Sequence, residues 1–196
     1  MRRRVAGIDE AGRGPLAGPV VAAAVILRPG RRIDGVADSK VLSPEERAAL
    51  SLTIRRDVLC FGIGWADRAE IDALNILQAT FLAMRRALLA MSLMPDHVLV
   101  DGNRLPHLGG LGRPVTGRAI IGGDATHPAI SAASILAKTA RDNYMNQMDA
   151  LYPAYSFAAH KGYCTPLHQR LLEEHGPCPL HRRSFAPVRL ALRVAL

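Results

Sequence analysis

The stretch AGIDEAGRGPLAGPVV, residues 6–21, decides how the N-terminal part of the chain folds. An apolar run ends in two adjacent carboxylates, Asp9 and Glu10, and a glycine-rich bend follows at once. Because the bend leaves no room for a helix, we predict that strands at 2–9 and 18–27 pair antiparallel. Neighbouring acids repel each other and glycines cost entropy on folding. The adjacent acids and the glycines are unfavourable for folding, so we look for a functional reason for them.

The rest of the chain reads as strands that alternate with helices. We predict further strands at 58–66, 96–101 and 118–124. We predict four helices: one that begins with a capping box at Ser43, Pro44 and Glu46, one over 74–91, one over 127–148, and one from Thr165 to Gly176. Such alternation after an antiparallel pair is typical of an α/β fold with a mixed central sheet flanked by helices. We expect one domain over 1–196, with a small C-terminal helical part from about residue 155 packed on it.

Composition narrows the class of protein. Apolar residues make up 49% of the 196 residues and charged residues 21%, which is typical of a folded globular chain. The formal charge of +8 favours an anionic partner, with nucleic acid first, although an arginine-rich codon bias is an alternative. No apolar run is long enough to span a bilayer and no secretory signal is present, so we expect no membrane association and a cytoplasmic location. Cys60, Cys164 and Cys178 have no metal-binding spacing and suit reduced thiols.

Four carboxylates stand at the ends of predicted strands: Asp9, Glu10, Asp101 and Asp124. Sites in open α/β sheets form beyond the carboxyl ends of strands. A cluster of acids there is disfavoured unless a cation neutralises it, and oxygen-only ligands select Mg²⁺ or Mn²⁺. Two such ions about 4 Å apart can hydrolyse a phosphodiester. We therefore hypothesise a metal-dependent phosphodiesterase site.

Other interpretations of these residues are open. Any one of the acids could cap a turn or a helix, as we expect for Asp38 and Asp96. The glycines at 12, 14 and 18, with an acid at 34, are also similar to a dinucleotide-binding fingerprint. That motif needs a helix at the glycines, whereas PVVAAAVIL at 19–27 favours a strand. A non-catalytic basic module that binds nucleic acid is a further alternative, but four acids would repel its phosphates when no metal is bound.

Six blocks together resemble the ribonuclease HII family, the bacterial type 2 ribonucleases H. They are GIDEAGRGPLAGPVVAAAV at 7–25, DSK at 38–40, LVDGN at 99–103, GGDATHPAISAASILAKTARD at 122–142, HKGYCT at 160–165 and HRRSFAPV at 181–188. The resemblance implies a ribonuclease H-like fold. It also implies hydrolysis of the RNA strand of RNA–DNA hybrids and cleavage on the 5′ side of single ribonucleotides in duplex DNA, which leaves 3′-hydroxyl and 5′-phosphate ends.

The resemblance also assigns roles to residues. The four acids become the catalytic ligands of Mg²⁺ or Mn²⁺, two ions per site. The ribose-reading loop matches Gly12, Arg13 and Gly14, and only the 2′-hydroxyl distinguishes RNA from DNA at one position. Tyr163 matches the tyrosine that packs against the next sugar. We expect Lys40 of the DSK block to bind a phosphate, and a surface lysine near a helix start is the alternative. The implied role is ribonucleotide removal and primer clean-up. Separately, we expect the chain to be a monomer.

Several neighbouring residues have less specific expectations. We expect Lys138 and Arg141 to pair with Asp142 or a neighbour, although a contact with the nucleic-acid backbone is open for both and for the serine at 134. We expect His127 to cap or line a helix start, and a DNA contact is open for His160. The family often has a lysine two residues before the fourth acid, where this chain has a glycine at 122. The C-terminal RLALRVAL shows no clear clamp-binding peptide.

Overall fold

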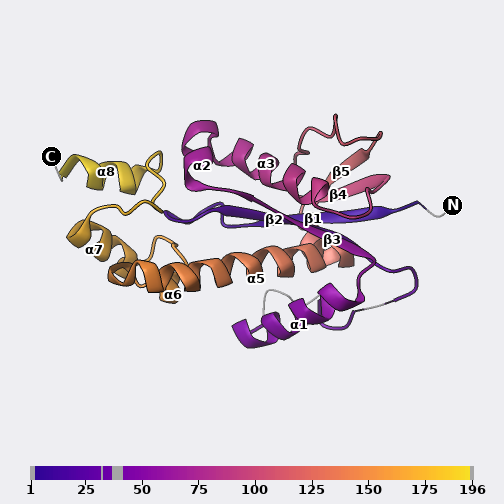
Figure 1. The fold of residues 1–196 in the computed structure, drawn as a ribbon, viewed down its shortest axis with the longest axis horizontal. Helices are drawn as coiled ribbons and strands as arrows, with labels where there is room; N and C mark the ends of the chain where they lie inside the picture. The colour runs from indigo at the N-terminus through magenta and orange to yellow at the C-terminus, as the bar shows by residue number, and fades with distance from the viewer. Residues whose placement is uncertain (1–2, 32, 37–41, 195–196) are drawn as a thin grey trace.

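The computed structural model describes residues 3–31, 33–36 and 42–194, and the strands among them form one mixed sheet (Figure 1). The strands are β1 Val5–Ala11, β2 Val20–Ile26, β3 Cys60–Ala66, β4 His97–Asp101 and β5 Thr116–Ile120. Their order is β3-β2-β1-β4-β5; β2 pairs antiparallel with β1 and β3, whereas β4 pairs parallel with β1 and β5. The predicted antiparallel pair and mixed sheet are confirmed, and β1 is the central strand.

Helices cover both faces of the sheet (Figure 1). α3, Ile76–Leu89, lies on one face and α5, Pro128–Leu151, lies along the other. α3 approaches β3 closely because a glycine stands at the contact: a Cβ on Gly64 would lie 2.1 Å from the carbonyl oxygen of Ala83. α1, Pro44–Asp57, packs against the outer side of α5.

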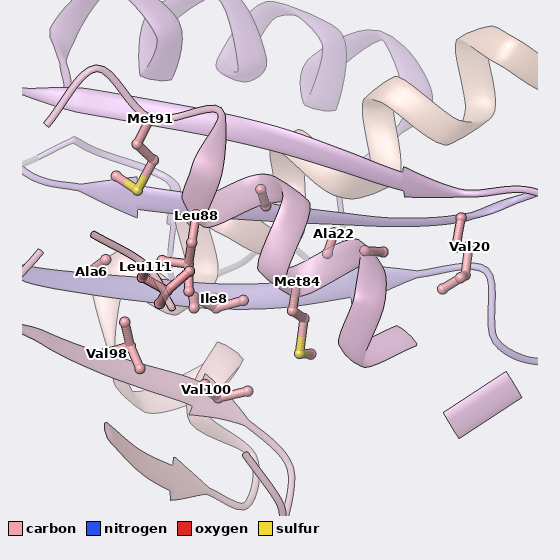
Figure 2. Close-up of a cluster of buried hydrophobic side chains, with 14 of the residues drawn as sticks. Ala6, Ile8, Val20, Ala22, Met84, Leu88, Met91, Val98, Val100 and Leu111 are labelled. Carbon is pink, nitrogen blue, oxygen red and sulfur yellow. The ribbon is translucent and has the colours of Figure 1, made fainter. Parts of the chain in front are cut away.

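The main hydrophobic core lies between the sheet and α3 (Figure 2). Ile8 of β1 and Val98 and Val100 of β4 point into it, and Met84 and Leu88 of α3 cover them. All five side chains are almost completely buried. Because side chains alternate along a strand, the intervening residues of β1 and β4 point to the face covered by α5. The core thereby determines on which face of the sheet each functional side chain lies.

The predicted start of α1 is confirmed. The Ser43 hydroxyl accepts a hydrogen bond from the backbone N–H of Glu46, and the Glu46 carboxylate accepts one from the N–H of Ser43. Pro44 occupies the first turn, where a missing N–H costs nothing. This reciprocal pair satisfies two amides that have no partner within the helix.

The prediction of one helix over 74–91 is wrong at its N-terminal end. Asn75 has a φ of 69° and separates α2, Arg68–Leu74, from α3. The Asn75 side chain accepts hydrogen bonds from the N–H groups of Leu77 and Gln78, so asparagine tolerates the unusual backbone and caps the second helix. Leu74 is consequently exposed rather than part of the buried stripe.

The predicted strand 118–124 also ends early. β5 stops at Ile120, and Gly122 takes a left-handed φ of 66° before α4, Gly123–Thr126. Asp124 therefore lies in a single helical turn rather than at a strand end. Glycine at 122 permits the tight turn that a lysine would strain.

Short helices follow α5 and gather at one end of the sheet (Figure 1). They are η2 Pro153–Tyr155, α6 Phe157–His160, α7 Pro166–His175 and α8 Ala186–Val194. The predicted start of α7 is confirmed, because the Thr165 side chain accepts from the N–H of His168. Leu172 of α7 and Val188 of α8 are buried against Leu16. Within the described part of the chain, no helix has the length and apolar character needed to cross a membrane.

Candidate active site

Two neighbouring parallel strands bring three of the predicted acids to one edge of the sheet. The register of β1 and β4 aligns their carboxyl ends, where Asp9, Glu10 and Asp101 stand. The Asp9 carboxylate accepts a hydrogen bond from Ser134 on α5. Because strand side chains alternate, Glu10 starts toward the opposite face, and it lines a hollow beside α3 as well as the cavity beside α5. The two adjacent acids therefore straddle the sheet edge instead of stacking.

The fourth acid reaches this edge through α4. The backbone N–H of Asp124 donates to the Asp101 carboxylate at 3.3 Å. The backbone carbonyl of Asp124 accepts from the Ser131 hydroxyl at the start of α5, and the Asp124 side chain is only 7% exposed. The left-handed turn at Gly122 thus places the fourth acid beside the end of β4.

The acids destabilise one another in their charged forms. Burial raises the pKa of Asp9 well above its ordinary value, and the charges of Glu10 and Asp101 raise it further, while hydrogen bonds from Ser134 and the Glu10 N–H oppose the rise. Burial also raises the pKa of Glu10, against the stabilising charge of Arg13, whose guanidinium lies 3.2 Å from the Glu10 carboxylate. Positive charge from outside the protein would relieve this repulsion.

The donor set fits a hard divalent cation. All four side chains offer carboxylate oxygens, which Mg²⁺ and Mn²⁺ prefer. Within residues 3–31, 33–36 and 42–194, no group of three or more His, Cys, Asp or Glu side chains is already arranged as a metal-binding cluster. The four acids lie at one edge of the sheet, but in this structure their side chains are not arranged as a coordination sphere.

A cavity of about 330 Å³ opens beside the acids. Its lining combines acidic, basic and glycine residues: Glu10, Ala11, Gly12, Arg47, Asp124, Ser134, Ile135, Lys138 and Tyr163. Negative charge for a cation and positive charge for a phosphate therefore lie within one hollow. Such a mixture suits an anionic ligand that binds together with metal ions.

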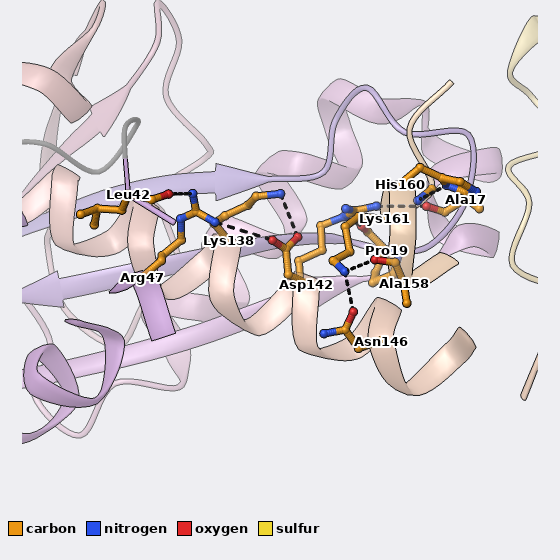
Figure 3. Close-up of polar contacts among 12 residues, drawn as sticks. Ala17, Pro19, Leu42, Arg47, Lys138, Asp142, Asn146, Ala158, His160 and Lys161 are labelled. Carbon is orange, nitrogen blue, oxygen red and sulfur yellow. Dashed lines mark hydrogen bonds and ion pairs between the residues drawn. The ribbon is translucent and has the colours of Figure 1, made fainter. Parts of the chain in front are cut away.

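Two basic side chains of the cavity form ion pairs with one acid (Figure 3). The Lys138 ammonium lies 2.8 Å from the Asp142 carboxylate, which confirms the predicted ion pair, and the Arg47 guanidinium lies 4.0 Å from the same group. Arg47 also donates to the carbonyl of Leu42. Sequence reasoning missed Arg47, because only the packing of α1 on α5 brings it to the site.

The predicted substrate-contacting residues lie in two interlocked loops. The N–H of Leu16 donates to the carbonyl of Gly162, which ties the loop 12–19 to the loop 160–165. Tyr163 is 41% exposed at the cavity, and a Cβ on Gly14 would lie 4.0 Å from its ring. Arg13 is exposed and paired with an acid of the cluster. Lys40 lies outside the described residues.

Arg141 does not pair with Asp142, contrary to one expectation, and it is not at the surface. Its side chain is fully buried and donates to the carbonyls of Pro19 at 3.0 Å and Ala17 at 3.1 Å. Burial lowers the pKa of the guanidinium. Backbone carbonyls of the glycine loop bind the side chain. The expectation of a contact between Arg141 and nucleic acid is therefore also wrong.

A second buried arginine completes the support of this loop. Arg182 donates to the backbone carbonyls of Gly12, Arg13, Gly18 and Pro19 at 2.6 to 3.2 Å. Burial, together with the charge of the other buried arginine, lowers the Arg182 pKa to about 9. The HRRSFAPV block contained this residue, but nothing in the sequence distinguished it from its neighbouring arginine.

His127 lines the start of a helix as expected, whereas the positions of the buried histidines were not predicted. His127 stands at the start of α5 without a capping hydrogen bond, and its ring contacts the Thr126 hydroxyl at 2.9 Å. His160 is buried, and both ring nitrogens are bonded to backbone groups of Tyr155 and Gly162. A DNA contact by His160 is therefore wrong. With His168 and His181 it forms a buried cluster that sequence reasoning missed.

This cluster predicts that the chain loses stability in mild acid. Burial lowers the pKa of both His168 and His181 to about 4, whereas in the unfolded chain each ring binds a proton near its ordinary pKa of 6.5. Between these values the two rings bind more protons in the unfolded state than in the folded state, so their contribution to the free energy of unfolding falls as the pH falls from 7 toward 4. The first proton on this coupled pair corresponds to about 3 kcal/mol.

Urea unfolding at several pH values measures this loss. A His168→Asn variant should show a flatter profile, whereas His175→Gln, at an exposed histidine of the same helix, should keep the slope of the parent chain. Equal slopes in the parent chain and in His168→Asn would contradict the prediction.

Comparison with known proteins agrees with this architecture. A sequence model of the family described as Ribonuclease HII matches residues 6–188. Ribonuclease HII of Bordetella pertussis (strain Tohama I) is 57% identical over 185 residues, which cover 94% of this chain and 90% of that protein. The crystal structure of the ribonuclease H2 from Pyrococcus horikoshii OT3 is 29% identical, with a TM-score of 0.84 over 97% of this chain and 98% of that one. Bst-RNase HIII in complex with Mn²⁺ has a TM-score of 0.75 at 20% identity, over 98% of this chain and 70% of that one.

The mixed sheet, with acids at the carboxyl ends of its central strands, has a ribonuclease H-like fold. The protein is therefore a nuclease, a metal-dependent hydrolase of phosphodiester bonds. The chain belongs to the ribonuclease HII family. Membership supports endoribonuclease activity on the RNA strand of RNA–DNA hybrids, as the resemblance implied.

Proposed function

We propose that this chain also cuts duplex DNA on the 5′ side of a single embedded ribonucleotide, leaving a 3′-hydroxyl and a 5′-phosphate. The observation that carries the proposal is one cavity that joins the acid cluster to the glycine loop and to Tyr163. A site that examines one sugar next to the cleaved bond needs the catalytic and sugar-reading groups within one nucleotide of each other. Removal of ribonucleotides from DNA is the role that this specificity serves.

Asp9, Glu10, Asp101 and Asp124 would hold two divalent ions, Mg²⁺ or Mn²⁺. When bound, such ions supply an activated water and positive charge for the leaving oxygen. The chain orients the ligands: Ser134 and the Glu10 N–H hold the Asp9 carboxylate. Asp101 is oriented by the N–H of Asp124. Arg47 and Lys138 would contact a phosphate beside the cleaved one.

The glycine loop is suited to read a 2′-hydroxyl. The carbonyls of Gly12 and Arg13 point toward Arg182, so the N–H groups of the bend face away from Arg182. The N–H groups of Arg13 and Gly14 have no hydrogen-bond partner within the described part of the chain. Two free amides near a sugar can hydrogen-bond a hydroxyl that DNA lacks. Tyr163 would pack against the following sugar, where deoxyribose fits best.

A duplex that differs at one sugar tests this specificity. We expect the chain to cut DNA that contains one ribonucleotide only when Mg²⁺ or Mn²⁺ is added, and to leave the all-DNA duplex intact. A 2′-O-methyl nucleotide at the same position should resist cleavage, because the methyl group crowds the glycine loop. Product ends are read by sequencing gel and by ligation.

Two outcomes would contradict the proposal. Cleavage on the 3′ side of the ribonucleotide would place the sugar-reading loop on the wrong side of the acids. Cleavage that persists in EDTA would exclude a metal-dependent site.

A further inference from the structure

Three buried histidines lie beneath the Tyr163 loop and take no part in the chemistry proposed above. The rings of His160 and His168 stack with centroids 4.2 Å apart. The Nε2 atoms of His168 and His181 lie 3.0 Å apart. All three side chains are more than nine-tenths buried. Three imidazoles packed together in this way require defined proton positions.

The backbone partners define those positions for the His168–His181 pair. The N–H of Cys178 donates to Nδ1 of His181 at 3.0 Å, so neutral His181 carries its proton on Nε2. Nδ1 of His168 faces the carbonyl of Tyr163 at 2.9 Å and must donate to it. The Nε2 of His168 is then the acceptor for His181. A directed chain of hydrogen bonds runs from the Cys178 N–H to the Tyr163 carbonyl.

His160 holds the other side of the loop. Its Nδ1 accepts from the N–H of Gly162 at 3.1 Å, and its Nε2 donates to the carbonyl of Tyr155 at 2.8 Å. The carbonyl of His160 also accepts from the N–H of Tyr163. The backbone on both sides of the Tyr163 side chain is therefore fixed by the stacked rings.

The loop that these rings fix is also joined to the glycine loop. Gly162 has a φ of 82°, and a Cβ there would lie 2.6 Å from the carbonyl oxygen of Ala17. Its carbonyl accepts the hydrogen bond from Leu16. The Tyr163 ring at the cavity mouth thus has little freedom to shift while the histidine chain is intact.

We propose that His168, oriented by His181, is a positioning residue that holds Tyr163 in place against the sugar of the bound duplex. The proposal rests on the function proposed above for Tyr163. It assigns the C-terminal helices a part in substrate discrimination, because His168 lies on α7 and His181 follows it. Neither residue touches the acids, so the effect of changing them should pass through Tyr163.

Two substitutions of His168 distinguish the effect of its Nδ1 hydrogen bond from the effect of its side-chain volume. His168→Leu keeps a similar volume but removes the donor, whereas His168→Asn keeps an N–H near the position of Nδ1. On duplex DNA with one ribonucleotide and Mg²⁺, we expect His168→Leu to lower kcat/KM about tenfold, mainly by raising KM, as befits one lost hydrogen bond. His168→Asn should recover to within about threefold of the parent chain. Equal losses in both variants would overturn the proposal.

A double-mutant cycle tests whether His168 acts through Tyr163. In a Tyr163→Ala background the ring is gone, so His168→Leu should cost less than about twofold. An unchanged tenfold cost in that background would mean that His168 supports the fold in general, and the proposal would fail. Thermal unfolding of each variant shows that the compared chains are folded.

The proton positions can be tested without any activity. Nitrogen-15 NMR of the parent chain at pH 7 should show His168 protonated at Nδ1, and His160 and His181 protonated at Nε2. The opposite tautomer of His168 would overturn the proposal even in an active enzyme. If the tautomers are as stated but the parent chain does not cut at a ribonucleotide, the proposed function fails while the hydrogen-bond chain stands.

Discussion

Asp101→Asn should lower the cleavage rate about a thousandfold or more, because it removes one charge from the ligand set while keeping the shape of the side chain. The asparagine oxygen can still accept the hydrogen bond from the N–H of Asp124, so the turn at α4 should persist. Duplex binding in EDTA, measured by fluorescence anisotropy, should be equal to or tighter than that of the parent chain, since an acid that repels phosphate is gone.

Asp96→Asn is the matched control for this prediction. Asp96 immediately precedes the same strand and pairs with Arg4 and Arg113, away from the cavity. Its replacement should leave kcat within about twofold, because these partly exposed ion pairs lie outside the cavity. In EDTA, Asp101→Asn should also melt at a higher temperature than the parent chain, because the charge of Asp101 disfavours ionised Asp9. An Asp101→Asn variant that retains a tenth of the parent activity would remove this acid from the catalytic set.

Arg182→Leu should destabilise the fold by about 3 to 5 kcal/mol, and at ordinary temperatures much of the chain should be unfolded. The side chain satisfies carbonyls of Gly12, Arg13, Gly18 and Pro19, and leucine would leave all of them buried without a donor. Unfolding in urea, followed by circular dichroism, measures the loss.

Two further variants show where this loss originates. Arg183→Leu changes the adjacent, exposed arginine and should cost less than about 0.5 kcal/mol. Arg182→Lys keeps a positive charge, but a single ammonium cannot reach carbonyls on both sides of the loop. The folded fraction of that variant should discriminate poorly between ribose and deoxyribose, because the bend at Gly12 is no longer fixed. An Arg182→Leu variant within 1 kcal/mol of the parent chain would contradict the whole account of the loop.

Local signals in the sequence were enough for most of the secondary structure. The capping box at Ser43 and the short bend between β1 and β2 act within a few residues, so their outcome is visible in the sequence. The break at Asn75 shows the limit of such reasoning. An apolar period of three to four residues continues across it, and only the conformation of one asparagine, capping the helix that follows it, ends the first helix.

The candidate site divides in the same way. Acids at the ends of apolar runs predicted which residues would gather, because parallel strands place their carboxyl ends at one edge. The sequence did not predict that Asp124 arrives on a helical turn, or that Arg47 reaches the cavity from α1. Both depend on how elements pack, which periodicity does not report.

The sequence by itself determined the mixed α/β fold and the family, and it predicted the four acids, because these depend on patterns of neighbouring residues. Only the tertiary structure decided which arginine of the HRR run is buried and which histidines form a hydrogen-bond chain. Arg182 and the carbonyl of Gly18 are 164 residues apart in the chain, and His168 and His181 are 13 apart. The physical reason is that a buried polar group is stable only if a partner meets it there, and the partner is supplied by another part of the chain after it has folded.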